Sequence, residues 1–286
     1  MEAKTTTEVL LQALPYIQRF RGKVVVVKYG GNAMVDAELA TQFAEDIVLM
    51  HQVGIKPVVV HGGGPQITEL HGRLGKATEF KDGQRVTDAE SLEITRMVLV
   101  GKVNRELVGL INRHGPHAVG ISGEDAGLLL ATKRHPELGF VGDVEAVNAR
   151  IVEKLLAEDL IPVISTTGSD ATGQSYNINA DAVAGALAAT LQAEKVVYLT
   201  NVEGLQRDRE DPTSLISRLS ASQLDELVQS GAVGTGMIPK AAGCIHAVDH
   251  GVTSAHMING TIPHVLLVEL FTDAGIGTMI TKGDPS

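Results

Sequence analysis

Short runs rich in valine and isoleucine recur along the chain, and most are separated by segments with apolar residues at helical spacing. Strands that alternate with helices form mainly parallel sheets, because each crossover helix packs back onto a face of the sheet. We therefore expect an α/β fold. The expected strands are 24–27, 58–60, 118–121, 161–164 and 196–199. The expected helices are 36–54, 65–74, 88–113, 150–158, 180–192, 221–230 and 237–250.

Residues 5–20 precede the first strand and lie outside this alternation. Their apolar residues predict an amphipathic helix, which Pro15 should kink. Such a helix needs an apolar surface to rest on, either that of its own domain or that of another subunit. We divide the chain into an N-terminal helix (1–22), a first lobe (23–193) and a second lobe (194–286).

The charge and composition exclude several classes of protein. A formal net charge of −10 without a basic run argues against a nucleic-acid partner. The one cysteine, Cys244, cannot form an internal disulfide, which fits a reducing cytoplasm. Because the N-terminus is a poor signal peptide and no apolar run approaches the roughly 18 residues that span a bilayer, we expect no membrane partner. His246 and His250 have no third ligand nearby, so we assign no metal site.

Clusters of glycine follow the expected strands or open the expected helices: "KYGGN" (28–32), "HGGGP" (61–65), "GISGEDAG" (120–127) and "GTGMIPK" (234–240). A tight turn explains any one cluster. Together they favour an anion site, because backbone N–H groups and helix dipoles converge at this edge of an open α/β sheet. Neither a Walker A pattern nor GxGxxG occurs, which argues against a P-loop and a dinucleotide fold.

Two lysines accompany these glycines. Lys28 ends a strand that is otherwise apolar, so its ammonium group needs a charged partner or an exit to water. Lys240 follows Gly236 by one helical turn, at the start of an expected helix. A solvated side chain remains an alternative interpretation of Lys240.

Five motifs in this order resemble the acetylglutamate kinases of the amino acid kinase family: "VVVKYGGNAM", "VVVHGGGPQI", "RVTD", "NINAD" and "GMIPK". The resemblance runs from about residue 9 to residue 281. It implies an αβα sandwich around a mainly parallel eight-stranded sheet, with an extra N-terminal helix. The first lobe would bind the amino-acid substrate and form the dimer, and the second would bind ATP. The resemblance also implies transfer of the γ-phosphoryl group of MgATP to the side-chain carboxylate of N-acetyl-L-glutamate, in arginine biosynthesis. MgATP would be the co-substrate, and no organic cofactor is expected.

The resemblance assigns roles to individual residues. Lys28 and Lys240 match the catalytic lysines, and Asp181 matches the carboxylate that holds them. The implied phosphate-binding residues are Gly30, Gly31, Asn32 and Gly62. The implied residues for N-acetylglutamate are Gly63, Gly64, Arg85, Asn177 and Asn179. The implied nucleotide-binding residues are Thr200, Asn201, Gly204, Gly234, Gly236 and Met237.

The side chains of Arg85 and Asn201 allow a more specific chemical interpretation. Arg85 would form a bidentate pair with the α-carboxylate of the substrate, which suits a planar guanidinium group better than an ammonium group. Asn201, in "YLTNVEGL", replaces the aspartate that the family usually carries. This change keeps a hydrogen-bonding side chain and removes a charge. We give His61 no acid–base role, because the reaction has no difficult proton transfer.

The N-terminal helix and the segment 256–280 resemble the arginine-inhibited acetylglutamate kinases, in which kinked helices interlace dimers into a hexamer. The resemblance therefore implies feedback inhibition by L-arginine and a homo-oligomer. The residues implied at or near the arginine site are Tyr16, His256, Glu269 and Gly275.

Two other functions compete with this interpretation. One is another carboxylate kinase of the same fold, such as a glutamate 5-kinase, and Arg85 together with "NINAD" argues against it. The other is a non-catalytic arginine sensor. A sensor has no reason to keep Lys28, Lys240 and Asp181 together, which argues against the second alternative.

Overall fold

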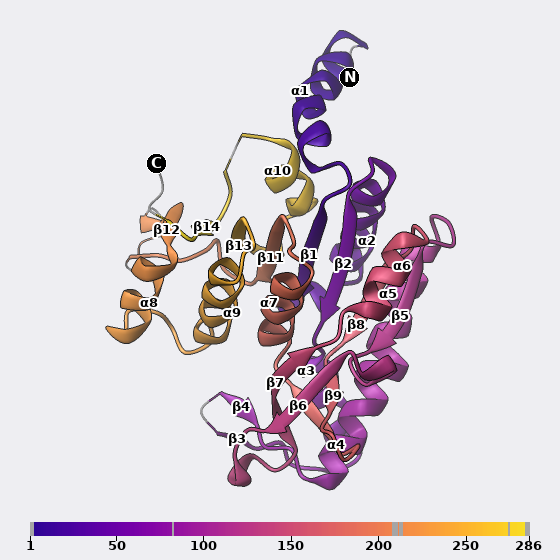
Figure 1. The fold of residues 1–286 in the computed structure, drawn as a ribbon, viewed down its shortest axis with the longest axis vertical. Coiled ribbons are helices and arrows are strands. Elements are labelled where there is room, and N and C mark those ends of the chain that lie inside the picture. The colour runs from indigo at the N-terminus through magenta and orange to yellow at the C-terminus, as the bar shows by residue number, and fades with distance from the viewer. Residues whose placement is uncertain (1–2, 82, 208–210, 212–213, 274, 284–286) are drawn as a thin grey trace.

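The structure, a computed structural model, describes residues 3–81, 83–207, 211, 214–273 and 275–283. Its centre is one eight-stranded sheet (Figure 1). All neighbouring strands pair in parallel except β13 and β14, which confirms the predicted mainly parallel sheet. The order is β12 (Arg218–Ser220), β14 (Thr278–Thr281), β13 (Ser254–Asn259), β11 (Lys195–Thr200), β1 (Val24–Tyr29), β2 (Lys56–His61), β8 (Ile161–Ser165) and β5 (Ala118–Ser122).

Helices cover both faces of the sheet, as the predicted sandwich requires (Figure 1). Successive valines of β1 alternate between the faces: Val26 packs on one side, and Val25 and Val27 on the other. The Val26 face carries α6 (Arg150–Ala157), α7 (Ala180–Thr190), α8 (Ala221–Gln229) and α9 (Ile238–Asp249). The opposite face carries α2 (Ala37–Gln52), α10 (Val265–Phe271) and the long helix described next.

The predicted helix 88–113 is continuous but not uniform. It consists of α4 (Ala89–Arg96), a π-helical segment η2 (Met97–Val103) and α5 (Asn104–Asn112). The π-helical segment was not predicted from the sequence, because its apolar residues follow the ordinary helical pattern on both sides.

Several short elements surround the carboxyl ends of the central strands. The 3₁₀ turn η1 (Gly31–Met34) follows β1, and α3 (Gly64–Arg73) follows β2. A short antiparallel hairpin pairs β3 (Phe80–Lys81) with β4 (Gln84–Arg85). Four strands that the sequence did not predict close on one another below the sheet: β6 (Leu129–Lys133), β7 (Val141–Val147), β9 (Thr167–Ser169) and β10 (Ser175–Ile178).

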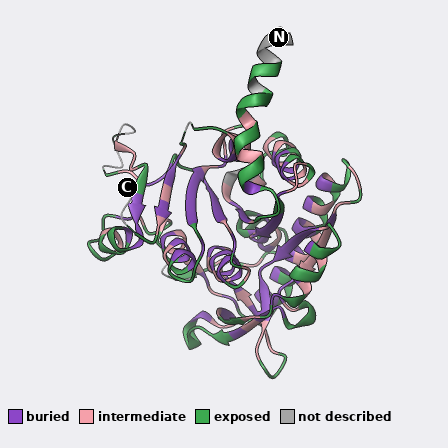
Figure 2. Ribbon diagram, turned by 45° about the horizontal axis from the view of Figure 1, so that its top comes forward, coloured by how far each residue is buried: buried purple, intermediate pink, exposed green. Residues whose placement is uncertain are grey.

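The N-terminal helix α1 (Ala3–Phe20) stands away from the rest of the molecule (Figure 2). Its last residue, Phe20, is buried, whereas Leu10, Leu11 and Leu14 are 67%, 62% and 45% exposed. The domain therefore covers only the C-terminal end of the predicted apolar stripe.

The sheet is continuous across the predicted boundary at residue 193, because β1 of the first lobe pairs with β11 of the second. The division into lobes stays a prediction. Among the described residues, no helix is long and apolar enough to cross a bilayer.

Candidate active site

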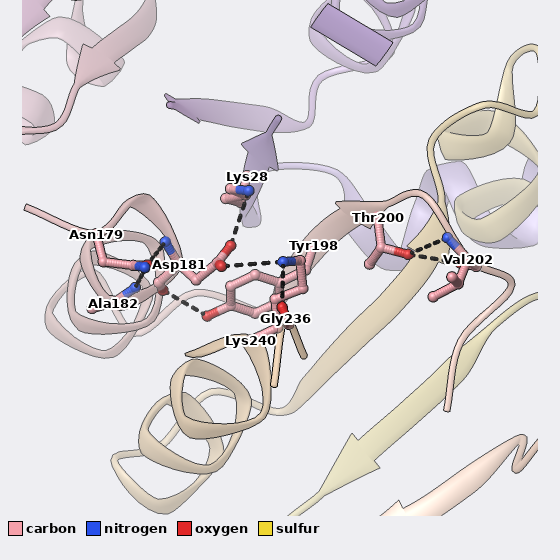
Figure 3. A network of polar contacts seen from close by, with 9 residues as sticks. All are labelled: Lys28, Asn179, Asp181, Ala182, Tyr198, Thr200, Val202, Gly236 and Lys240. Carbon is pink, nitrogen blue, oxygen red and sulfur yellow. Dashed lines mark hydrogen bonds and ion pairs between the residues drawn. The ribbon is translucent and has the colours of Figure 1, made fainter. Parts of the chain in front are cut away.

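Asp181 lies between the two predicted catalytic lysines (Figure 3). Its Oδ1 atom is 3.0 Å from Nζ of Lys28, and its Oδ2 atom is 3.3 Å from Nζ of Lys240. All three residues are largely buried or half-buried. The fold therefore brings together three ionic groups from β1, α7 and α9 that are far apart in the sequence.

Local sequence explains how each group reaches this point. Lys28 ends β1, and a Cβ atom on Gly30 would lie 2.5 Å from its Nζ, so the glycine leaves room for the lysine to fold across it. Asp181 stands in the first turn of α7, where Asn179 Oδ1 accepts hydrogen bonds from the backbone N–H of Asp181 (2.8 Å) and of Ala182 (3.4 Å). The Asn179 side chain thus acts as the helix cap in this structure.

The packing of α7 against α9 fixes the distance between Asp181 and Lys240. A Cβ atom on Gly185 would lie 2.7 Å from the Gly243 carbonyl oxygen, so the two helices are in contact through their backbones. The buried Tyr198 hydroxyl fits beside this contact and donates a hydrogen bond to the Asp181 carbonyl oxygen at 3.3 Å (Figure 3). These three supporting residues were not predicted from the sequence.

The charges at the site do not balance. Burial by itself would raise the pKa of Asp181, but the ammonium groups of Lys28 and Lys240 outweigh it and hold the pKa below its ordinary value. One carboxylate between two ammonium groups leaves one positive charge in excess. An anion that enters this space gains attraction from that excess.

Three glycine loops meet near these groups. A Cβ atom on Gly31, whose φ is +73°, would lie 2.5 Å from Oδ1 of Asn201, so the loops after β1 and β11 touch. The Gly62 N–H group donates to the Tyr29 carbonyl oxygen at 3.2 Å. Gly62 was predicted to offer this donor to phosphate. In the structure it links two loops instead, and the nearby donors that face no protein acceptor among the described residues are the N–H groups of Gly63 and Gly64. The predicted Asn32 side chain lies outside the described part.

Arg85 lies beside the N-terminal part of α3, at another side of the site. It is buried, and its Nη2 atom donates to the Gly64 carbonyl oxygen at 3.0 Å and to Thr68 Oγ1 at 2.7 Å. Its Nη1 atom is also buried and has no hydrogen-bond partner within the described residues. The guanidinium group lies over the ring of Phe80 at 4.8 Å, and burial lowers the pKa of Arg85. A guanidinium group with one unused edge fits a carboxylate ligand.

Asn177 belongs to the same side of the site. Its Nδ2 atom donates to Thr87 Oγ1 at 3.3 Å, and the Thr87 hydroxyl in turn donates to the Arg85 carbonyl oxygen at 3.0 Å. Thr87 was visible in the motif "RVTD" but received no role, and Thr68 gave no signal at all.

The predicted nucleotide-binding residues surround or adjoin a cavity of about 350 Å³. Gly204, Gly234, Gly236 and Met237 line it, together with the apolar side chains of Val202, Leu205, Ile216 and Leu227 and the longer Gln206 and Arg207. The Thr200 hydroxyl shapes the neighbouring turn, because it donates to the Val202 carbonyl oxygen at 2.7 Å and accepts from the Val202 N–H at 3.0 Å. Among the described residues, no cluster of three or more His, Cys, Asp or Glu side chains is placed to hold a metal ion.

Tyr16 of α1 and Glu269 of α10, both predicted for arginine, belong to two helices that contact each other. Glu269 Oε1 is 2.7 Å from Nδ1 of His256 and 2.8 Å from Nζ of Lys195. A hydrogen bond to Asp273 raises the pKa of Tyr16. Gly275 follows α10 in the chain and has φ +48°. Lys195 and Asp273 were not predicted.

The amino acid kinase family matches residues 23–259. The chain belongs to the amino acid kinase family. Acetylglutamate kinase of Moorella thermoacetica is 52% identical to this kinase, and the alignment covers 97% of each chain. Acetylglutamate kinase of Synechocystis sp. is also 52% identical, and the alignment covers 98% of this kinase and 94% of that protein.

Solved structures include N-acetylglutamate synthase from Neisseria gonorrhoeae. Its complex with coenzyme A and N-acetyl-glutamate superposes on this kinase with a TM-score of 0.85 and 26% identity, covering 98% of this chain and 64% of that chain. Its complex with coenzyme A and L-arginine gives a TM-score of 0.80 and 25% identity, covering 97% and 65%. The kinase spans less than two thirds of the synthase.

Proposed function

We propose that this kinase transfers the γ-phosphoryl group of MgATP to the side-chain carboxylate of N-acetyl-L-glutamate, a step of arginine biosynthesis. The observation that carries the proposal is the Lys28–Asp181–Lys240 arrangement beside the glycine loops. Relatives of 52% identity over nearly the whole chain, all named acetylglutamate kinase, support the choice of substrate.

The reaction is a displacement at phosphorus. A carboxylate oxygen of N-acetylglutamate attacks the γ-phosphorus, the bond to the bridging oxygen breaks, and ADP leaves with the electron pair. Both reactants are anions, so positioning and electrostatic stabilisation carry the catalysis, and no general base is required. A cation about 4 Å from a unit negative charge contributes roughly 4 kcal/mol at an effective dielectric constant near 20. Each lysine can thus account for about a thousandfold in rate.

The two lysines approach the transferring group from different halves of the chain. Lys28 comes from β1, next to the loop of Gly30 and Gly31, and Lys240 comes from the first turn of α9, next to the nucleotide cavity. Asp181 holds both at fixed positions, so the site loses little entropy when the anions bind. Backbone N–H groups of the glycine loops add donors for the phosphoryl oxygens.

N-acetylglutamate binds between the N-terminus of α3 and Arg85. The unused Nη1 edge of Arg85 receives the α-carboxylate, while Gly64 and Thr68 hold the other edge. Asn177 contacts the amide group of the substrate from β10, and Asn179 supports it by fixing the start of α7. The nucleotide occupies the cavity lined by Gly204, Gly234, Gly236 and Met237, with Thr200 and Asn201 at its edge.

L-arginine inhibits the kinase at the cluster of Glu269, His256 and Lys195. Both partners of Glu269 contact Oε1, and Oε2 has no ion pair within the described residues. The carboxylate can therefore accept a guanidinium group through Oε2. Tyr16 approaches this region from α1, which contacts α10, so a ligand there links the N-terminal helix to the second lobe. Gly275 follows α10 in the chain and completes the proposed site.

The kinase forms a homo-oligomer through α1, as a hexamer of three dimers, in the cytoplasm. Exposed Leu10, Leu11 and Leu14 form an apolar face that no part of the described chain covers. A second copy that presents the same face buries both.

A single assay tests the activity. The protein is supplied with MgATP and a panel of acids, and hydroxylamine traps any acyl phosphate as a hydroxamate. We expect hydroxamate from N-acetylglutamate alone. Hydroxamate from glutamate or aspartate but not from N-acetylglutamate would identify a kinase of the glutamate 5-kinase type. No hydroxamate from any acid would favour the non-catalytic arginine sensor.

Two further measurements test the regulation. L-arginine at millimolar concentration should lower the rate of hydroxamate formation, and an unchanged rate refutes the inhibition. Removal of residues 1–20 should reduce the mass of the assembly in light scattering, and an unchanged mass refutes the role of α1.

A further inference from the structure

His61 is a buried polar residue that the proposed reaction does not use. It is the last residue of β2, directly before the three glycines that open α3, and it is fully buried. Its Nδ1 atom lies 2.9 Å from the Gly62 carbonyl oxygen, and its Nε2 atom lies 3.1 Å from Nδ2 of Asn104. The ring thus connects the glycine loop to the start of α5.

The neighbours of Asn104 determine where the proton of His61 resides. The Nδ2 atom of Asn104 donates to the Val163 carbonyl oxygen at 2.9 Å, and its Oδ1 atom accepts from the guanidinium group of Arg105. Both contacts fix the orientation of the amide. Its nitrogen therefore donates to Nε2 of His61, so Nε2 carries no proton and Nδ1–H donates to the Gly62 carbonyl oxygen. Burial also lowers the pKa of His61, to about 4.

This hydrogen bond determines the direction of a neighbouring donor. The Gly62 carbonyl group and the Gly63 N–H group belong to one trans peptide, and they point to opposite sides of it. With the carbonyl group held by the His61 ring, the Gly63 N–H points away from the ring. It joins the Gly64 N–H at the N-terminus of α3, the end of a helix that attracts anions.

The π-helical segment η2 holds the same loop by contact. A Cβ atom on Gly63 would lie 2.6 Å from Cδ2 of Leu99 and 3.4 Å from Cγ2 of Val103, so both side chains pack on the glycine. Asn104 follows η2 directly. The wider π turn thus lets one helix place Leu99 and Val103 against Gly63 and Asn104 against His61. π turns are rare and often occur at functional sites.

We propose that His61 and Asn104 are positioning residues for phosphoryl transfer, which hold the Gly62 peptide so that the Gly63 N–H is aimed at the bound anions. The proposal rests on the proposed kinase activity. Neither side chain touches the substrates, so their loss lowers kcat through a misdirected donor and leaves the affinity for ATP, which binds in the other lobe, nearly unchanged.

The variants His61→Asn and His61→Gln separate positioning from packing. The amide nitrogen of asparagine reaches the place of Nδ1 and keeps the bond to Gly62, whereas that of glutamine reaches the place of Nε2 and loses it. We expect kcat of His61→Asn within threefold of the unsubstituted protein and kcat of His61→Gln at least tenfold lower. The KM for ATP should change less than threefold in both.

Asn104→Leu is the second test, with Asn112→Leu as its matched control. Asn112 lies on the same helix and likewise donates to the backbone of a neighbouring strand, the Ala118 carbonyl oxygen of β5 at 3.1 Å, but away from the glycine loop. We expect at least a tenfold loss of kcat for Asn104→Leu and less than threefold for Asn112→Leu. Equal rates for all four variants and the unsubstituted protein, or equal losses for His61→Asn and His61→Gln, would overturn the proposal.

Nitrogen-15 NMR of histidine-labelled protein gives a readout that needs no activity. The Nε2 resonance of His61 should have the shift of an unprotonated nitrogen and stay constant from pH 8 to pH 5.5. Asn104→Leu should change it. A proton on Nε2, or titration near pH 6.5, would refute the proposed hydrogen bonds from Asn104 through His61 to Gly62, even if the protein phosphorylated nothing. Absence of hydroxamate with N-acetylglutamate, by contrast, would refute the kinase assignment and leave the proposal about these hydrogen bonds standing.

Discussion

Asp181 and Glu269 are two buried carboxylates that each have two basic partners, and they differ in charge. Asp181 lies between two lysines, at 3.0 Å and 3.3 Å. Glu269 lies between Lys195 and His256, at 2.8 Å and 2.7 Å. Burial lowers the pKa of His256 below its ordinary value, which favours the neutral form of its ring. The Glu269 cluster is therefore balanced, whereas the Asp181 cluster keeps one positive charge in excess.

The surroundings of the two clusters match this difference. Glycine loops, which have no side chains to fill the space, adjoin the Asp181 cluster. The Glu269 cluster is covered by α1, and Nζ of Lys195 lies 5.4 Å from the centre of the Phe20 ring. A buried charge in excess is costly unless an anion binds beside it. A cluster with excess positive charge beside glycines is thus typical of a substrate site. A cluster of balanced charge beneath a helix is typical of a structural or regulatory contact.

The largest expected effect comes from removing the excess charge. Lys28→Ala should lower kcat about a thousandfold, because one ammonium group near the transferring phosphoryl contributes roughly 4 kcal/mol. Binding of N-acetylglutamate, measured by calorimetry, should change little. Lys102→Ala is the control, since its partner Glu69 is on the surface. A loss of substrate affinity that equals the loss of rate would mean that Lys28 only binds.

The balanced cluster should respond in stability rather than in rate. Glu269→Gln leaves the charge of Lys195 buried and unpaired, which lowers the free energy of unfolding by about 3 kcal/mol. It should also abolish inhibition by arginine and leave kcat without arginine within threefold. Urea unfolding and the hydroxamate assay measure the two effects. Glu69→Gln, on the surface, should change stability by less than about 0.5 kcal/mol. A large loss of kcat in Glu269→Gln would contradict the separation of the two clusters.

Acid should protonate His256 and so give the Glu269 cluster an excess positive charge like that of the Asp181 cluster. Because the folded protein holds the pKa of His256 below its ordinary value, the unfolded chain binds more protons below about pH 6.5. The free energy of unfolding therefore falls as the pH drops below that value. Burial also lowers the pKa of His61, so His256→Gln removes only its own share of this proton uptake and should reduce the slope in urea titrations at pH 7.5, 6.5 and 5.5. The same slope in the variant, with the exposed His135→Gln as control, would assign the dependence to other groups.

The smallest effect is expected from restoring a charge that this chain lacks. Asn201→Asp adds a carboxylate against Gly31, close to the cluster with the positive excess. It should raise the KM for ATP by less than tenfold, since the lysines remain in place. The measurement is a saturation curve in ATP at fixed N-acetylglutamate, with Asn201→Ala to separate the charge from the hydrogen bond. A lower KM in Asn201→Asp would mean that the carboxylate serves a bound Mg²⁺ ion rather than opposing phosphate.

Much of the fold was predictable because it depends on local sequence patterns, such as the alternation of strands and helices and the capping of helix ends. The alternation of short strands and helices identified five neighbouring parallel strands, from β11 to the edge strand β5. Asp36 accepts hydrogen bonds from two N–H groups at the start of α2, as a capping residue should. Seven strands were missed: β12, β13 and β14 of the main sheet, and β6, β7, β9 and β10 of the smaller one. The last four are short and many of their residues are exposed or polar, so their pattern resembles that of loops.

Local sequence specifies most of the central strands and helices, the places where glycine leaves space and, through motifs, the residues that resemble a known site. Which charges meet depends instead on how the elements pack. The partnership of Asp181 with Lys28 and Lys240 depends on α7 and α9 packing side by side on the sheet. The contacts of Glu269 with Lys195 and of His61 with Asn104 likewise join elements far apart in the chain. The spacing of residues in the sequence does not predict such pairs, because long-range packing alone sets the distance between them.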